Sequence, residues 1–161
     1  LPWFYLAPRI QVMADEDRVL ELLRSGRVDP STMALVERAL PIELTNPNDT
    51  SGDRVDVVEH NPPEGFIDLQ THSENARLLV VSENYQSNWS VWVDGEPADM
   101  LRVNYVWKGV TLPAGTHKVE FRYRSPILFW SRTATVFCAL FVVGLIASDG
   151  IRRRKLVPRG K

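Results

Sequence analysis

The chain has 161 residues, of which 44% are hydrophobic and 24% are charged, so its composition excludes a disordered tail, a collagen and a disulfide scaffold. Its net charge of −1 conceals an asymmetry: residues 1–131 carry 12 Lys and Arg against 19 Asp and Glu, whereas residues 132–161 carry 7 against 1. Because an acidic body gains nothing from releasing the counterions of phosphate, nucleic acid is excluded as a partner.

Residues 1–30 are predicted to form a short strand and a short helix that pack on a β-sandwich. Alternating Ile10 and Val12 indicate the strand. The helix is expected to begin after Asp15, whose carboxylate can cap the first turn, and to end at Gly26. Its predicted buried stripe consists of Val19, Leu22 and Leu23.

Residues 31–126 are predicted to form the sandwich itself. Residues 32–44 suggest one strand and residues 46–53 a loop, after which side chains alternate with a period of two. Asp94-Gly95 is typical of a two-residue hairpin turn, and Pro97 limits the returning strand to an edge. The segment from Pro113 to Thr116 predicts a second hairpin between its flanking strands. Short strands at this spacing are typical of an antiparallel sandwich.

Residues 127–150 are predicted to form a transmembrane helix, since Thr133–Ser148 contains no charge, with Trp130 and Arg132 as interfacial anchors. The alternative is a buried helix of a soluble domain. The following basic tail, residues 151–161, carries Arg152, Arg153 and Arg154, which the positive-inside rule places in the cytoplasm. Residues 156–160 resemble a thrombin-cleavage linker, left by cloning or present by chance. The predicted fold class is therefore mainly β: an antiparallel β-sandwich of jelly-roll or immunoglobulin-like type with one short N-terminal helix, followed by a C-terminal transmembrane helix.

The usual signatures of a catalytic or metal site are not found in the sequence. His60, His72 and His117 lack the spacing of metal ligands, and Cys138 lies in the predicted membrane segment. Neither a glycine-rich phosphate loop nor a nucleophile elbow occurs, and nothing selects one carboxylate pair among the acids. We therefore predict no catalytic residue, no metal and no cofactor.

Aromatic side chains gather in one third of the sequence. Trp89 and Trp92 are three apart in a presumed strand, so they face opposite sides and at least one lies outside the core. An outward ring can stack on a sugar, a membrane interface or a neighbouring domain, whereas ordinary core packing is the alternative. The candidate binding residues are Tyr85, Trp89, Asp94, Tyr105 and Trp107.

Residues 78–126 carry a series of short motifs: Ser82-Glu83-Asn84-Tyr85, Trp89, Asp94-Gly95, Asn104-Tyr105, Pro113-Ala114-Gly115-Thr116-His117 and Val119 to Pro126. In order and spacing this stretch resembles the C-terminal end of YfhO-like bacterial integral membrane proteins, and residues 14–30 resemble the region before it. Ser87-Asn88 departs from the Pro-Gly usual there. The resemblance implies an extracytoplasmic β-domain that leads into the last transmembrane helix.

The same resemblance implies a function. YfhO-like proteins are multi-pass and resemble C-type glycosyltransferases, which use polyprenyl-phosphate sugars and keep their catalytic acids in outer loops that this sequence does not contain. The chain is thus expected to be a non-catalytic extracytoplasmic accessory domain and membrane anchor, with its C-terminus cytoplasmic, in a bacterial membrane protein that acts on cell-envelope glycans or glycolipids. Expected partners are the lipid bilayer, an upstream transmembrane part or partner membrane subunit, and a glycan or lipid-linked sugar.

Two other interpretations stay open. One is a single-pass, membrane-anchored glycan-binding or assembly module without enzymatic activity. The other is a self-contained soluble enzyme, which requires residues 133–148 to form a core helix.

Overall fold

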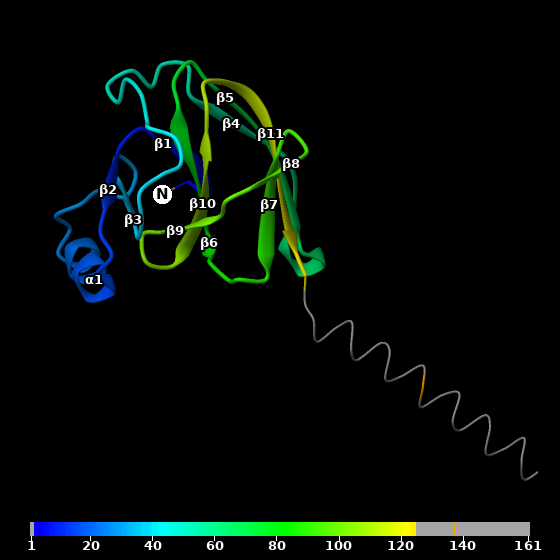
Figure 1. The fold of residues 1–161 in the computed structure, drawn as a ribbon, viewed down its shortest axis with the longest axis horizontal. Coiled ribbons are helices and arrows are strands. Elements are labelled where there is room, and N and C mark those ends of the chain that lie inside the picture. The colour runs from blue at the N-terminus through cyan, green and yellow to red at the C-terminus, as the bar shows by residue number, and fades with distance from the viewer. Residues whose placement is uncertain (1, 125–136, 138–161) are drawn as a thin grey trace, which may run out of the picture. The chain divides into compact units, whose positions relative to one another are not determined.

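Two β-sheets, one short α-helix and one 3₁₀ turn make up the part of the chain that the computed structural model describes, residues 2–124 and residue 137 (Figure 1). In chain order the elements are β1 (Phe4–Ala7), β2 (Ile10–Val12), α1 (Glu16–Arg24), β3 (Ala34–Val36), β4 (Arg54–Asn61), η1 (Pro62–Glu64), β5 (Phe66–Ser73), β6 (Arg77–Asn84), β7 (Trp89–Val93), β8 (Glu96–Ala98), β9 (Leu101–Val103), β10 (Trp107–Leu112) and β11 (Gly115–Tyr123). The prediction of a mainly β fold with one short N-terminal helix agrees with this architecture.

Sheet A has the strand order β1-β6-β10-β9-β3-β2, and its outer face is covered by the chain's own N-terminal third. One cluster of buried side chains on that face includes Tyr5, Leu78 and Val80, and Leu40 and Leu44 pack against it. The opposite face packs on the second sheet. Because both faces are covered, residues 77–81 of β6 are buried without interruption.

Sheet B has the order β4-β5-β11-β7-β8, and within residues 2–124 only its inner face is covered. In β5 the inward Ile67, Leu69, Thr71 and Ser73 are buried, while the side chains between them point outward and are polar apart from Phe66. This alternation of buried and accessible positions is expected for a sheet with one face towards solvent.

The prediction of a purely antiparallel sandwich is wrong at one strand pair. β2 and β3 run parallel, with Ile10 opposite Ala34 and Val12 opposite Val36. A parallel pair needs a crossover, and α1 with its flanking loops supplies it (Figure 1). The strand expected over residues 32–44 is correspondingly short, because only residues 34–36 pair with β2 and β9.

The predicted second hairpin is also wrong. β10 pairs with β6 and β9 in sheet A, whereas β11 pairs with β5 and β7 in sheet B. Residues 113–114 therefore carry the chain from one sheet to the other. A proline-containing turn forms a corner between sheets as readily as a hairpin, and local sequence does not separate the two.

Two predicted local features are confirmed. Asp15 caps α1, since its carboxylate accepts a hydrogen bond from the amide of Arg18 at 3.1 Å, and Val19 is buried, whereas Leu22 and Leu23 are half-buried. Asp94 and Gly95, with φ of 53° and 86°, form a tight turn between β7 and β8 that needs positive φ at both positions. β8, which contains Pro97, lies at the edge of sheet B as expected.

The fold-class prediction also included a C-terminal transmembrane helix, and this part is corrected. Among the residues that the structure describes, no helix is long and apolar enough to cross a membrane, and α1 has nine residues. The segment 127–150 lies outside the described residues except at position 137, as do the predicted anchors Trp130, Arg132, Arg152, Arg153 and Arg154 and the tail 151–161. The described fold is a two-sheet β domain with one short helix.

Candidate functional site

Trp89, a predicted binding residue, lies in the core between the two sheets. Its side chain is 8% exposed, and its ring centroid is 5.4 Å from that of Tyr123. The ammonium nitrogen of Lys108 lies 3.3 Å from the centroid of the indole ring, within the range of a cation–π interaction. The structure therefore places the indole of Trp89 in the core rather than on the surface of the domain.

The other predicted binding residues do not form one site. Tyr85, Tyr105 and Trp107 are half-buried near one end of sheet A, where the Tyr85 amide donates a hydrogen bond to the Val106 carbonyl at 2.6 Å. Asp94 lies in the β7–β8 turn, at the opposite end of β7 from Trp89, and contacts His117 Nδ1 at 2.7 Å. The sequence pattern thus grouped residues that the fold separates.

A charged cluster, in which Lys108 is buried and His60 reaches the surface, lies beside Trp89. Lys108 Nζ is fully buried and lies 2.9 Å from Glu83 Oε2, while Glu83 Oε1 lies 2.7 Å from His60 Nε2. Burial alone raises the pKa of Glu83, but hydrogen bonds from His60 and Lys108 outweigh burial and hold that pKa below its usual value. Burial lowers the pKa of Lys108, and Glu83 partly offsets the shift. The cluster therefore places an ion pair inside the sandwich.

Aromatic rings shield this cluster on its outer side. The ring centroids of Trp3 and Phe4 lie 5.8 and 5.2 Å from that of His60. Sequence reasoning missed the cluster, although one signal was available: Lys108 alternates with Val110 and Leu112, so all three point to the same face. Glu83 pairs with both His60 and Lys108, which offsets part of the cost of burying these charges.

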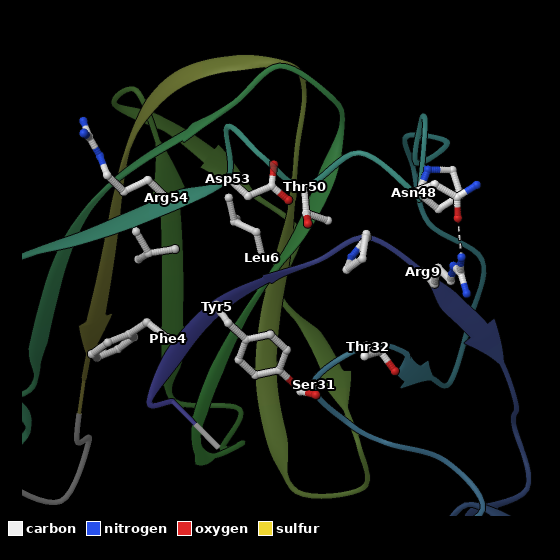
Figure 2. A pocket seen from close by; sticks show the side chains of 13 residues that line it. Phe4, Tyr5, Leu6, Arg9, Ser31, Thr32, Asn48, Thr50, Asp53 and Arg54 are labelled. Atoms are coloured by element: carbon white, nitrogen blue, oxygen red, sulfur yellow. Dashed lines mark hydrogen bonds between the residues drawn. The ribbon is translucent and has the colours of Figure 1, made fainter.

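A cavity of about 600 Å³ lies between β1, the start of β4 and the loop before it. We call it the β1 cleft; Figure 2 shows Phe4, Tyr5, Leu6, Arg9, Ser31, Thr32, Asn48, Thr50, Asp53 and Arg54 around it, and Pro8, Pro47 and Val55 complete the lining. Arg9 donates a hydrogen bond to the side-chain oxygen of Asn48 across its rim. The lining therefore combines an apolar wall from β1 with hydroxyl, amide and guanidinium groups.

The phenol of Tyr5 is held in place at the floor of the β1 cleft. Its hydroxyl donates a hydrogen bond to the carbonyl of Pro30 at 2.7 Å. Burial raises the pKa of this phenol above its ordinary value, so Tyr5 stays neutral and acts as a fixed wall.

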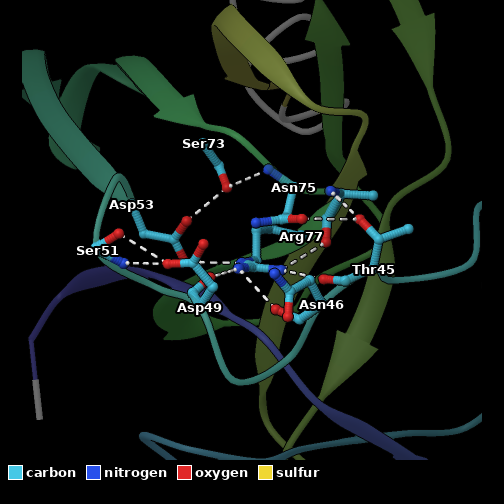
Figure 3. A network of polar contacts seen from close by, with 9 residues as sticks. Thr45, Asn46, Asp49, Ser51, Asp53, Ser73, Asn75 and Arg77 are labelled. Carbon is cyan, nitrogen blue, oxygen red and sulfur yellow. Dashed lines mark hydrogen bonds and ion pairs between the residues drawn. The ribbon is translucent and has the colours of Figure 1, made fainter.

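A fully buried arginine fixes the loop that forms one wall of the cleft. Figure 3 shows the guanidinium of Arg77 bound to the carboxylate of Asp53 and to the backbone carbonyls of the loop. Its Nε lies 2.7 Å from Asp53 Oδ2, and one terminal nitrogen lies 2.6 Å from the Thr45 carbonyl. Asp53 also accepts a hydrogen bond from Ser73 at 2.5 Å. The β1 cleft is therefore preorganised, so a ligand need not order this loop.

The side chains that line the β1 cleft offer hydrogen-bond donors and acceptors beside an apolar wall, which suits contact with a polar ligand. Within residues 2–124 and at residue 137, no group of three His, Cys, Asp or Glu side chains could hold a metal ion. The acid in the cleft, Asp53, is already engaged by Arg77 and Ser73.

Comparison with known proteins gives one match. The pattern that defines the bacterial membrane protein YfhO matches residues 51–133, more than half of the chain. The chain belongs to the YfhO family. The matched region includes every strand from β4 to β11, as well as Asp53 and Arg77, so the YfhO pattern covers sheet B and the ion pair of the network, whereas the loop residues 45–50 lie before it. Neither a curated protein nor a solved structure matches this YfhO-family chain.

Proposed function

We propose that this β domain is the non-catalytic, outward-facing accessory domain of a multi-pass, glycosyltransferase-like YfhO protein. In this role it holds a cell-envelope glycan or a lipid-linked sugar. The observation that carries the proposal is the preorganised, mixed-polarity β1 cleft in a member of a bacterial membrane-protein family.

The size and lining of the β1 cleft suit a saccharide. Its volume of about 600 Å³ falls within the range of roughly 300–1,000 Å³ found for small-molecule sites. A saccharide presents hydroxyl groups and patches of C–H. The cleft offers matching groups, since Arg9, Asn48 and Thr50 can bind hydroxyls and Phe4 offers an apolar surface.

Binding without chemistry still assists a transferase. A domain tethered to the enzyme raises the effective concentration of whatever it binds near the active site. The basic end of the chain, with Arg152, Arg153 and Arg154, suits the cytoplasmic side under the positive-inside rule, which would leave the β domain on the outer side.

The orientation is tested by labelling intact cells with a membrane-impermeant maleimide. Cys138 is the single cysteine of these 161 residues, so a background with every cysteine of the whole protein replaced and with Val58→Cys places one thiol on the β domain, at a position that is 63% exposed. We expect labelling in intact cells. Labelling only after lysis would contradict the outward orientation.

The role of the cleft is tested by Arg9→Ala with Arg38→Ala as matched control. Both arginines are exposed, but Arg38 lies outside the cleft and pairs with Asp99 at 2.7 Å. We expect Arg9→Ala to lower glycan transfer several-fold in cells at unchanged protein level and Arg38→Ala to leave it unchanged. Equal transfer in both variants would contradict the proposal.

An immunoblot of native membranes with an antibody against residues 50–125 tests the multi-pass assignment. A band far larger than this 161-residue chain supports it. A band of the chain's own size would favour the single-pass binding module instead.

A further inference from the structure

The outer face of sheet B carries a second hollow, separate from the β1 cleft. Its volume is about 730 Å³, and its lining consists of Glu59, Glu64, Gly65, Phe66, Asp68, Trp92, Gly95, Glu120, Arg122, Tyr123 and Arg124. The two hollows share no lining residue. We call this one the β7 groove.

Strand register places an indole next to a row of carboxylates in the β7 groove. Trp92 lies opposite Glu120, Glu120 opposite Asp68, and Asp68 opposite Glu59, on four neighbouring strands. Neighbouring strands are about 4.8 Å apart, so the row crosses the sheet in regular steps of that size. An aromatic ring thus stands at one end of a line of hydrogen-bond acceptors.

Trp92 is the outward member of the tryptophan pair. Trp89 and Val91 point into the core, whereas Trp92 is half-exposed on the other face of β7. Its cross-strand neighbour is the exposed Pro97 of edge strand β8. Together the indole and the pyrrolidine ring form an apolar platform at the edge of a polar surface.

Arg122 fixes the carboxylates of the row and adds donors. Its guanidinium bonds to Asp68 and lies 2.9 Å from Glu120 Oε1, and it stacks 5.9 Å from the centroid of Phe66. The hydrogen bond with Asp68 raises the pKa of Arg122, so the group stays charged. The groove therefore presents donors and acceptors in a fixed arrangement.

The charge of the lining excludes one class of ligand. Four acids, Glu59, Glu64, Asp68 and Glu120, face two bases, Arg122 and Arg124. An excess of negative charge repels phosphate and uronic-acid groups. An uncharged ligand with many hydroxyls avoids that repulsion and uses both donors and acceptors.

We propose that the β7 groove binds an uncharged pyranose unit of a glycan. The C–H face of the sugar stacks on Trp92, and its hydroxyls donate to Glu120 and accept from Arg122. This inference relies on the proposed function for the presence of a glycan next to the domain, but it names a separate site on the other sheet.

The test is an NMR titration of the full chain in a detergent without sugar headgroups. The chain has five tryptophans and hence five indole N–H signals. The probes are maltotriose, cellotriose and tri-N-acetylchitotriose, with trigalacturonate as the anionic comparison. We expect at least one neutral trisaccharide to shift a single indole N–H signal until the shift saturates. Trigalacturonate should leave all indole signals unchanged.

Two variants assign that signal. Trp92→Ala removes the platform and should weaken binding about tenfold, which corresponds to about 1.4 kcal/mol. Trp3→Ala is the matched control, since Trp3 is 60% exposed and lies outside the groove. This substitution should leave the affinity for the saccharide unchanged. A cooperative thermal unfolding transition within a few degrees of that of the parent chain shows that Trp92→Ala is folded. Trp92→Phe, which keeps an aromatic ring, should restore part of the affinity.

Three results would overturn the proposal that the β7 groove binds an uncharged pyranose unit. They are no shift with any neutral trisaccharide, a shift that persists in Trp92→Ala, and an equal response to trigalacturonate. The outcome is separable from that of the proposed function, because Arg9→Ala alters the β1 cleft only. Loss of transfer in Arg9→Ala cells with no saccharide shift would refute the groove and keep the cleft. A saccharide shift together with normal transfer in Arg9→Ala cells would support the β7 groove and refute the proposed role of the β1 cleft.

Discussion

The two sheets of this domain differ in how many of their faces are covered. Sheet A is covered on both faces, and residues 77–81 of β6 are all buried. Sheet B is covered on one face, and β5 alternates between buried and accessible positions. The comparison shows where polar groups serve the fold and where they are free to bind a ligand.

Charged residues illustrate this difference. Arg77 and Lys108, both on sheet A, are fully buried and paired with Asp53 and Glu83. Arg122 on the outer face of sheet B is partly exposed and also pairs with acids. A buried charge without its partner is far more costly than an exposed one, so substitutions on the two sheets should have unequal effects.

The largest expected effect is that of Lys108→Ala. This change leaves Glu83 partly buried without its ammonium partner, at a cost of about 3–5 kcal/mol in the free energy of unfolding. Lys118→Ala is the matched control, since Lys118 lies 57% exposed on sheet B and should change stability by less than about 1 kcal/mol. Urea denaturation of both variants measures the difference. Equal losses in the free energy of unfolding would contradict the contrast between the buried charges of sheet A and the exposed charges of sheet B. Lys108→Met combined with Glu83→Gln should recover part of the loss.

A nearly equal effect is expected for Trp89→Ala, because truncating a buried aromatic side chain costs about 3–5 kcal/mol. Trp92→Ala should cost about 1 kcal/mol or less, since Trp92 faces outward and is half-exposed. Thermal unfolding followed by circular dichroism distinguishes the two. A larger loss for Trp92 than for Trp89 would reverse our assignment of the two faces.

A moderate effect is expected for Gly109→Ala at the centre of sheet A. A Cβ atom there would lie 2.7 Å from the Leu79 carbonyl oxygen and 2.8 Å from Val103 Cγ2. Overpacking of this kind costs about 1–3 kcal/mol. Gly52→Ala is the control, because its nearest contact is a flexible Glu74 side chain at 3.4 Å. Similar denaturation midpoints for both variants would show that the neighbouring strands of sheet A move apart to make room for the added methyl group at position 109.

The smallest effect concerns acid stability at the β7–β8 turn. Hydrogen bonds from His117 and from the Lys118 amide lower the pKa of Asp94. A carboxyl whose pKa is lower in the folded state stabilises the fold above its unfolded pKa, and this contribution is lost as the pH falls below about 4. Asp94→Asn, which keeps the positive φ, should therefore flatten the acid limb of a stability–pH curve. An unchanged limb would contradict this assignment.

Local signals in the sequence predicted the local parts of the fold. The cap at Asp15 and the turn at Asp94-Gly95 depend on a few neighbouring residues, so they were read correctly. The corner at residues 113–114 was read as a hairpin, because the choice between a hairpin and a corner depends on which distant strands pair. The parallel pairing of β2 and β3 was missed for the same reason.

The candidate sites were less predictable. The sequence indicated that Trp89 and Trp92 face opposite sides, but the pairing of β7 with β11 decides which one faces out. The buried partners of Arg77 and Lys108 come from 24 and 25 residues away, so sequence spacing did not reveal them. The β1 cleft joins β1 to residues 31–32 and 47–55, segments far apart in the sequence.

The edges of sheet B carry one more consequence. β4 is an edge strand of eight residues with Val57 and Val58 at least 50% exposed, and its register with β5 shifts between Val57 and Glu59. β8, the other edge, has three residues and contains Pro97. A bulge and a proline both prevent a neighbouring copy from adding a regular strand. Sheet B therefore resists edge-to-edge pairing with a second copy of the domain.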